Sequence, residues 1–195
     1  QERNKNMKQE NDRINHGPIG VFDSGYGGLT ILRRIRRRLP DYSYLYLGDN
    51  ARAPYGSRSF ELVHHFTRQA VEYLFAQGCR LVILACNTAS AKALRTIQQE
   101  YLPRYAPERR VLGVIRPTVE SLPATTRNGH IGLMATPGTV ASHSYRMETA
   151  KIDPEMHLTE IACPLLVPLI ENGEAESEGA DWFVAKYTRQ RLEAD

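Results

Sequence analysis

The stretch from Leu81 to Ser90 changes character within two residues, and it constrains the fold more than any other part of the chain. It opens with five apolar, mostly branched residues, which is typical of a strand buried in a parallel sheet. The N-cap types Asn87 and Thr88 follow, and the residues after them read as a helix. Cys86 is therefore expected at the carboxyl end of a strand and just before a helix, where open α/β sheets bind ligands.

The same order of strand, polar turn and helix recurs along the chain. We expect strands at residues 19–22, 44–47, 81–85, 111–115, 130–134 and 157–161. Each is separated from the next by a segment of crossover length, so the strands should pair mainly in parallel. The pattern predicts an α/β protein of two Rossmann-like domains, with mainly parallel sheets, helices on both faces and an active site in the cleft between the domains.

Proline and polar segments suggest where the domains divide. Residues 1–17 offer almost nothing to bury, and we expect a disordered leader there. Pro103 and Pro107 should interrupt the helix that follows Ser90. We therefore expect a first α/β domain over residues 18–102 and a second over residues 103–195.

Composition excludes several classes of protein. The chain has 195 residues, 42% hydrophobic and 24% charged, and no apolar run approaches the length of a membrane span. No signal peptide is recognised in its polar beginning. The three cysteines are odd in number and lack a CxxC pair, so we expect reduced thiols, a cytoplasmic location and no zinc site.

The net charge is only +3, and much of the positive excess lies between Arg33 and Arg38. Leu29, Leu32, Ile35 and Leu39 keep a helical spacing through this segment. The arginines are thus predicted on the solvated face of an amphipathic helix, and nucleic acid is not an expected partner.

The predicted strand ends bring together one thiol, one carboxylate, several hydroxyls and many backbone amides. The residues are Asp23, Ser24, Tyr55, Gly56, Cys86, Asn87, Thr88, Thr136 and Thr139. The glycine-rich turn at residues 25–28 departs from the dinucleotide fingerprint at Thr30, but its amides could bind a carboxylate or a phosphate. A helix N-terminus beside Cys86 should favour its thiolate.

A thiolate can act as a nucleophile or as a base. Acyl transfer would normally require a histidine partner, and His143 is the candidate on this side of the sheet. Proton abstraction from carbon requires a desolvated thiolate, an orienting group and donors for a substrate carboxylate. The residues fit proton abstraction better.

Five segments, taken in order, resemble bacterial glutamate racemases: residues 21–30, 48–56, 85–89, 135–140 and 162–171. The resemblance runs from about Pro18 to the end of the chain. It implies interconversion of L-glutamate and D-glutamate without a cofactor, by two cysteines on opposite faces of the substrate. The D-glutamate would supply peptidoglycan synthesis.

The resemblance also assigns roles. Cys86 would be the first catalytic cysteine, assisted by Asp23. The substrate would be held by Asp23, Ser24, Tyr55, Gly56, Asn87 and Thr88, with further contacts from Thr136 and Thr139. No metal ion is implied.

The family's second catalytic cysteine lies in a Gly-Cys-Thr-His motif that these 195 residues do not contain. Cys163 lies in an Ala-Cys-Pro-Leu context and is expected to be structural. We therefore expect a truncated, incompletely represented or shortened chain, with an incomplete second domain and without the C-terminal return to the first. Such a chain would serve one face of the substrate.

Two alternatives stay open from the residues. One is a related enzyme, either an aspartate racemase or a decarboxylase with a single thiol. The other is a non-catalytic interaction protein derived from a racemase, which would bind an acidic partner through residues 33–38. Glutamate is the expected small-molecule partner, the resemblance admits a homodimer, and the residues leave the oligomeric state open.

Overall fold

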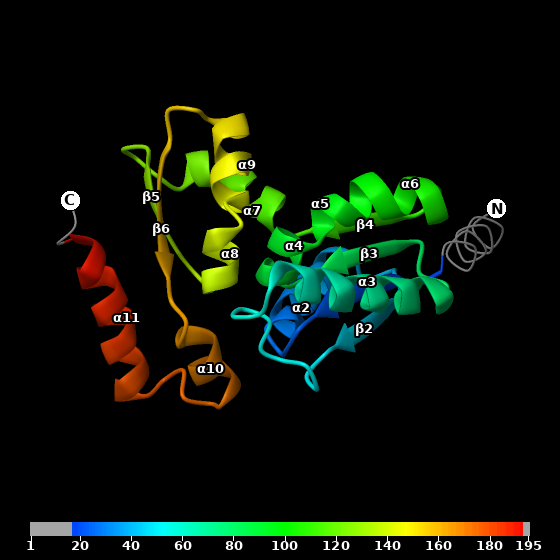
Figure 1. Ribbon diagram of the computed structural model, residues 1–195, viewed down its shortest axis with the longest axis horizontal. Coiled ribbons are helices and arrows are strands. Elements are labelled where there is room, and N and C mark those ends of the chain that lie inside the picture. Colours follow the sequence, from blue (N-terminus) through cyan, green and yellow to red (C-terminus); the bar gives the residue numbers. More distant parts are fainter. Residues whose placement is uncertain (1–16, 193–195) are drawn as a thin grey trace, which may run out of the picture.

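The computed structural model describes residues 17–192, which form two α/β parts lying side by side (Figure 1). A four-stranded parallel sheet has the order β2-β1-β3-β4, formed by β1 (Ile19–Asp23), β2 (Tyr44–Gly48), β3 (Leu81–Leu84) and β4 (Arg110–Gly113). A separate parallel pair is formed by β5 (His130–Ala135) and β6 (His157–Ala162). The predicted α/β class with parallel sheets is confirmed.

Helical segments connect the strands. They are α2 (Gly28–Arg38), α3 (Phe60–Ala76), α4 (Asn87–Lys92), α5 (Leu94–Thr96), the π-helix η1 (Ile97–Tyr101), α6 (Leu102–Tyr105), α7 (Ile115–Ser121), the 3-10 helix η2 (Leu122–Ala124), α8 (Pro137–Ala141), α9 (Ser144–Ile152), α10 (Leu166–Glu171) and α11 (Glu178–Leu192). The leader expected over residues 1–17 lies outside the described residues, Gly17 excepted.

Side chains alternate across the first sheet, and helices pack against both of its faces at β1. Val21 packs toward Leu32 of α2, while its neighbour Phe22 joins the core that α3 builds with Val63 and Leu74. Phe22 and Leu74 are fully buried. Each contributes about 2 kcal/mol of hydrophobic stabilisation, and this core fixes the strand ends that carry the site.

The strand expected at residues 111–115 extends the first sheet. Val111 of β4 pairs in register with Val82 of β3, so the two sheets divide after β4 rather than at Pro103. Val111 is buried, whereas Leu112 on the other face is 49% exposed. The outer face of β4 is therefore open in the described part of the chain.

Two expectations about local structure were wrong. Helical residues continue past Pro103 to Tyr105, because Pro103 is the second residue of α6, which follows the π-helix η1 without a break. The helix breaks instead at Ala93, whose φ of −123° separates α4 from α5. Similarly, Ile115, which the sequence predicted to end a strand, is the first residue of α7.

The second part contains β5, β6 and the helices around them. The single helix expected at residues 140–147 is split, because His143 adopts a left-handed conformation with φ 53° between α8 and α9. A buried cluster around Val119 and Tyr145 includes Ala91 of α4 and Leu158 of β6. The two parts thus share apolar contacts.

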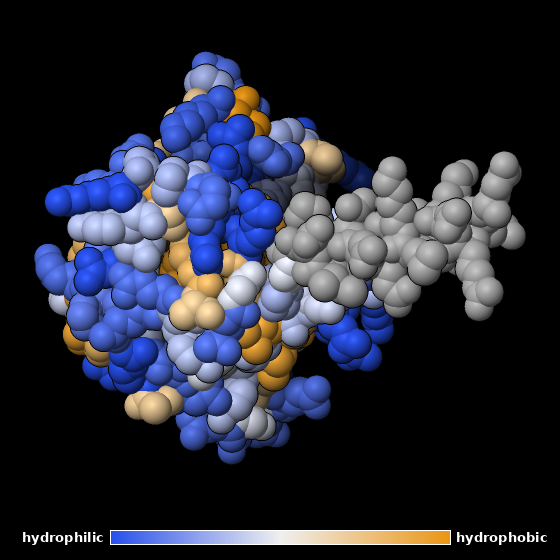
Figure 2. Space-filling model, turned by 90° about the vertical axis from the view of Figure 1, so that its right-hand side faces the viewer, coloured by the Kyte–Doolittle hydropathy of each residue, from blue (hydrophilic) through white to orange (hydrophobic). Residues whose placement is uncertain are grey.

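Most of the surface seen in Figure 2 is hydrophilic, with apolar residues in small patches. None of the helices within residues 17–192 is both long enough and apolar enough to cross a bilayer.

Candidate active site

Cys86 joins the end of β3 to the start of α4 through its own side chain. Its backbone is extended, and its Sγ accepts a hydrogen bond from the Ala89 amide at 3.4 Å, so the sulfur caps the helix. The sequence indicated Asn87 and Thr88 as capping residues, but both lie inside α4. The Cys86 side chain is buried.

The end of β1 lies beside Cys86 because β1 and β3 are neighbours in the sheet. Ser24 Oγ is 3.2 Å from Cys86 Sγ. The buried Asp23 carboxylate accepts a hydrogen bond of 2.8 Å from the amide of Gly28, the first residue of α2. The turn predicted over residues 23–28 is therefore closed by Asp23, at a helix terminus that favours negative charge.

The charge state of Cys86 is set by opposing effects. Burial raises the pKa of its thiol above the usual value, and the negative charge of Asp23 raises it further. Hydrogen bonds from Ser24 and Ala89 lower the pKa, but they do not outweigh burial. Burial of the sulfur thus acts against the thiolate that the helix N-terminus is expected to favour.

Tyr55 shapes the loop between β2 and α3. Its ring is fully buried against Phe22 and Phe66, at centroid distances of 6.3 and 5.8 Å. Its hydroxyl donates to the Asp49 carboxylate, so this hydroxyl is already engaged. The next residue, Gly56, accepts a hydrogen bond of 2.8 Å from the Gly138 amide. The loop is thereby tied to the start of α8.

Three threonines meet between α4 and α8. Thr88 Oγ1 is 2.9 Å from Thr136 Oγ1, which is 3.0 Å from Thr139 Oγ1. Beside them, Asn87 Oδ1 accepts a bond of 2.6 Å from the Tyr145 hydroxyl. The structure therefore brings the predicted residues into two neighbouring groups, one around Cys86 and one around Thr88.

Two further residues reach the turn at Gly25 and were not predicted from the sequence. A Cβ on Gly25 would lie 2.1 Å from Oε1 of Glu171, so this carboxyl group covers the turn. Burial and the charge of Asp23 raise the Glu171 pKa. The Tyr46 hydroxyl donates to the Gly25 carbonyl at 3.2 Å, and its pKa is raised to about 12, mainly by burial. The sequence signals that could have indicated them are the position of Tyr46 in β2 and the position of Glu171 at the end of segment 162–171.

Other candidates lie elsewhere. His143 is exposed, and its Nδ1 is 3.9 Å from Glu160 Oε2. Cys163 is buried and donates to the Ile161 carbonyl at 3.5 Å, as expected of a structural thiol. Neither residue joins the group around Cys86.

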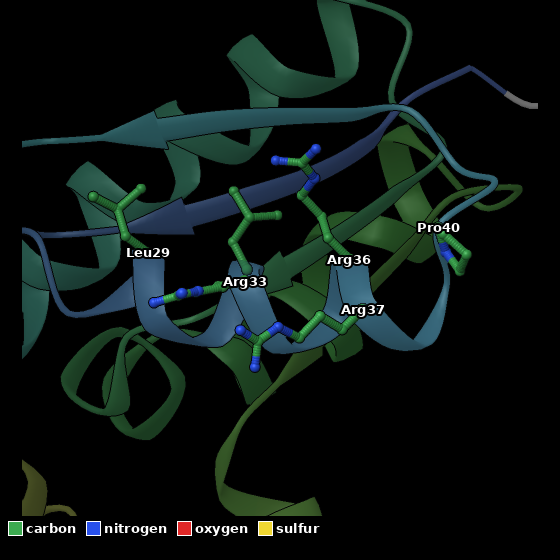
Figure 3. Close-up of a pocket in the computed structure, with 6 residues that line it drawn as sticks. Leu29, Arg33, Arg36, Arg37 and Pro40 are labelled. Atoms are coloured by element: carbon green, nitrogen blue, oxygen red, sulfur yellow. The ribbon is translucent and has the colours of Figure 1, made fainter.

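A groove of about 420 Å³ along α2 is separate from this site. Figure 3 shows that the guanidinium groups of Arg33, Arg36 and Arg37 point in different directions. They do not converge on one ligand position.

No protein-family model matches the chain. Known sequences do match it. The chain is 40% identical to the glutamate racemase of Lactobacillus acidophilus over 158 residues, covering 81% of this chain and 57% of the relative. It is 42% identical to the glutamate racemase of Synechocystis over 178 residues, covering 91% of this chain and 61% of the relative. It thus spans about three fifths of the curated relatives it matches.

Solved structures agree. Glutamate racemase isoform RacE1 of Bacillus anthracis aligns with a TM-score of 0.83 at 35% identity, over 92% of this chain and 65% of that one. The Francisella tularensis glutamate racemase in complex with D-glutamate aligns with a TM-score of 0.79 at 32% identity, over 90% and 64%.

Proposed function

We propose that the chain is a member of the glutamate racemase family and that Cys86 transfers a proton at one face of the α-carbon of glutamate. One observation carries the proposal. A buried thiol lies 3.2 Å from a serine hydroxyl, next to a buried aspartate, where two neighbouring parallel strands end. This edge of an α/β sheet is where such folds bind ligands.

The proposed step is a balanced proton transfer. The Cys86 thiolate takes the α-proton, so that the S–H bond forms while the C–H bond breaks and the electron pair stays on the substrate. In the reverse direction the thiol returns the proton to the same face. A thiol with a raised pKa gives a thiolate that is rarer but more basic, which suits abstraction from carbon.

The other proposed site residues hold the substrate. Asp23 assists Cys86 through its charge, and Ser24 orients the sulfur. Asn87, Thr88, Thr136 and Thr139 offer amide and hydroxyl groups to the substrate carboxylates. Tyr55 contributes by fixing the loop that presents Gly56. We propose Glu171 as an additional group of this site, because it covers the turn at Gly25.

Interconversion of enantiomers requires an acid or base on each face of the α-carbon. Among residues 17–192, Cys79 and Cys163 lie in other surroundings and no second thiol joins Cys86. We infer that the described residues serve one face. Interconversion of L-glutamate and D-glutamate would then require a second acid or base facing Cys86.

The test is incubation of the 195-residue protein with each glutamate enantiomer in deuterated water, followed by NMR of the α-proton. We expect exchange of the α-proton without inversion, loss of this exchange in Cys86→Ser and no change in the control Cys163→Ser. Exchange that survives in Cys86→Ser would overturn the role of Cys86. Full racemisation by this chain would overturn the restriction to one face.

We further infer glutamate as the small-molecule partner, a cytoplasmic location, supply of D-glutamate to peptidoglycan synthesis and a homodimer as the assembly to test. The D-glutamate complex of the Francisella relative supports the first inference. Light scattering would measure the assembly, and cell fractionation would measure the location. The proposed division into two α/β domains is supported by the two separate sheets, with its boundary after β4.

A further inference from the structure

Lys92, the last residue of α4, is a cation buried behind the site, and the proposed proton transfer does not use it. The residue is only 8% exposed. Its Nζ donates a hydrogen bond of 2.6 Å to the backbone carbonyl of Arg58. Burying an ammonium group is costly, so a buried lysine held by a carbonyl calls for a specific explanation.

Three segments of the chain meet at this ammonium group. A Cβ on Gly138 would lie 2.7 Å from both Cε and Nζ of Lys92, so the lysine stem packs directly against the start of α8. Gly138 in turn donates its amide to Gly56 at 2.8 Å. Two hydrogen bonds therefore anchor the loop at residues 56–58, one from α4 and one from α8.

The same face of α4 carries the contact to the hydroxyl cluster. Thr88 and Lys92 are four residues apart, so they lie one helical turn apart on one face. Thr88 contacts Thr136 at 2.9 Å, and a Cβ on Gly56 would meet Thr136 at 2.8 Å. Gly56 thus lies against Thr136, while Lys92 bonds the carbonyl of Arg58 two residues further along the same loop.

We propose that Lys92 is a positioning residue, which holds the loop at residues 54–58 in place against Thr88, Thr136 and Thr139. The proposal rests on the glutamate site proposed above. Burial lowers the pKa of Lys92, and the charge of Glu61 acts in the opposite direction.

The test variant is Lys92→Met, which keeps the length of the side chain and removes its donor and charge. Arg109→Met is the matched control. Arg109 also bonds backbone carbonyls, including that of Cys79 at 3.1 Å, but it precedes β4 at the opposite end of the sheet. Lys92→Gln keeps a hydrogen-bond donor but not the charge, and it is the variant to use if Lys92→Met does not fold. Its effect should lie between those of the unsubstituted protein and Lys92→Met.

The first measurement is hydrogen exchange of the Gly138 amide, which reads the junction independently of activity. A charged hydrogen bond contributes roughly 1.5–3 kcal/mol, so we expect exchange at least about tenfold faster in Lys92→Met. We expect no change in Arg109→Met. The proposal would be overturned if the Gly138 amide were equally protected in the unsubstituted protein, Lys92→Met and Arg109→Met. It would also be overturned if protection were lost equally in Lys92→Met and Arg109→Met.

The second measurement separates binding from chemistry. In Lys92→Met the Kd for glutamate should rise about tenfold, while α-proton exchange at saturating glutamate changes less than about twofold, because Cys86 and Ser24 are untouched. A fall in the exchange rate with an unchanged Kd would overturn the positioning role. If the unsubstituted protein binds no glutamate while Gly138 is still released in Lys92→Met, the glutamate site fails and the anchoring of the loop stands.

Discussion

Cys86 has two physical roles that depend on the same atom. Its sulfur accepts the Ala89 amide as the cap of α4, and it lies within reach of the Ser24 hydroxyl. Each proton gained or lost by the sulfur therefore changes the strength of a helix cap, because a charged acceptor forms the stronger bond.

Asp23→Asn should lower the pKa of the Cys86 thiol. The amide removes the negative charge that raises this pKa, and it keeps an oxygen to accept the Gly28 amide. The rate of alkylation of Cys86 by iodoacetamide, followed by mass spectrometry, should then rise at lower pH. The control Asp153→Asn, in the second part, should leave the midpoint of the pH dependence of alkylation unaltered. An unchanged midpoint in Asp23→Asn would show that the charge of Asp23 does not contribute to the pKa of Cys86.

Gly138→Ala should destabilise the protein by about 1–3 kcal/mol, because the added Cβ would meet the Gly56 carbonyl at 2.7 Å. Gly132→Ala is the control. Nothing lies within 4 Å of a Cβ at this position in β5, so the change should be within about 1 kcal/mol. Urea unfolding measures both, and equal stabilities would contradict the tight junction.

The helices that frame the site depend on their caps. Ser59 Oγ accepts the Leu62 amide at 3.2 Å at the start of α3. Ser59→Ala should therefore cost about 1 kcal/mol of unfolding free energy. Ser57, two residues earlier, is exposed and lies outside the helix, so Ser57→Ala should change stability by less than about 0.5 kcal/mol. Thermal unfolding that ranks the variants in reverse order would assign the cap to Ser57.

Strands were predictable to within a residue or two, because each is an apolar run followed by a polar turn. The helix interruptions were not. The helix breaks at Ala93 and continues past Pro103 because of tertiary packing and the π-helix between these residues. Neither of these leaves a signal in the local sequence.

The site was predictable where residues follow strands that are neighbours in the sheet, as Ser24 and Cys86 do. Glu171 was missed because α10 approaches Gly25 only in the folded chain. The engagement of the Tyr55 hydroxyl by Asp49 is likewise a property of the folded loop. Sequence patterns place residues at an edge, but they do not say which donors are already satisfied.

At the scale of the whole molecule, the two parts are joined by polar bonds as well as by the cluster around Val119. Tyr145→Phe removes the hydroxyl that donates to Asn87 at 2.6 Å, and it should cost about 1 kcal/mol. If the two parts unfold together, Tyr145→Phe should shift the unfolding midpoint by the same amount whether it is followed by Trp182 fluorescence or by far-UV circular dichroism. Separate transitions would contradict this coupling. Tyr44→Phe, which loses an exposed bond to Leu39, is the control.

The strand order also has a consequence for the nascent chain. β1 lies between β2 and β3, yet Ile19 pairs with Tyr44 on one side and with Leu81 on the other. Ribosomes add about 5–20 residues per second, so one edge of β1 stays uncovered for about 2–7 seconds after β2 has emerged. An open strand edge is a template for intermolecular pairing, and translation speed over residues 49–81 should therefore influence the yield of folded protein.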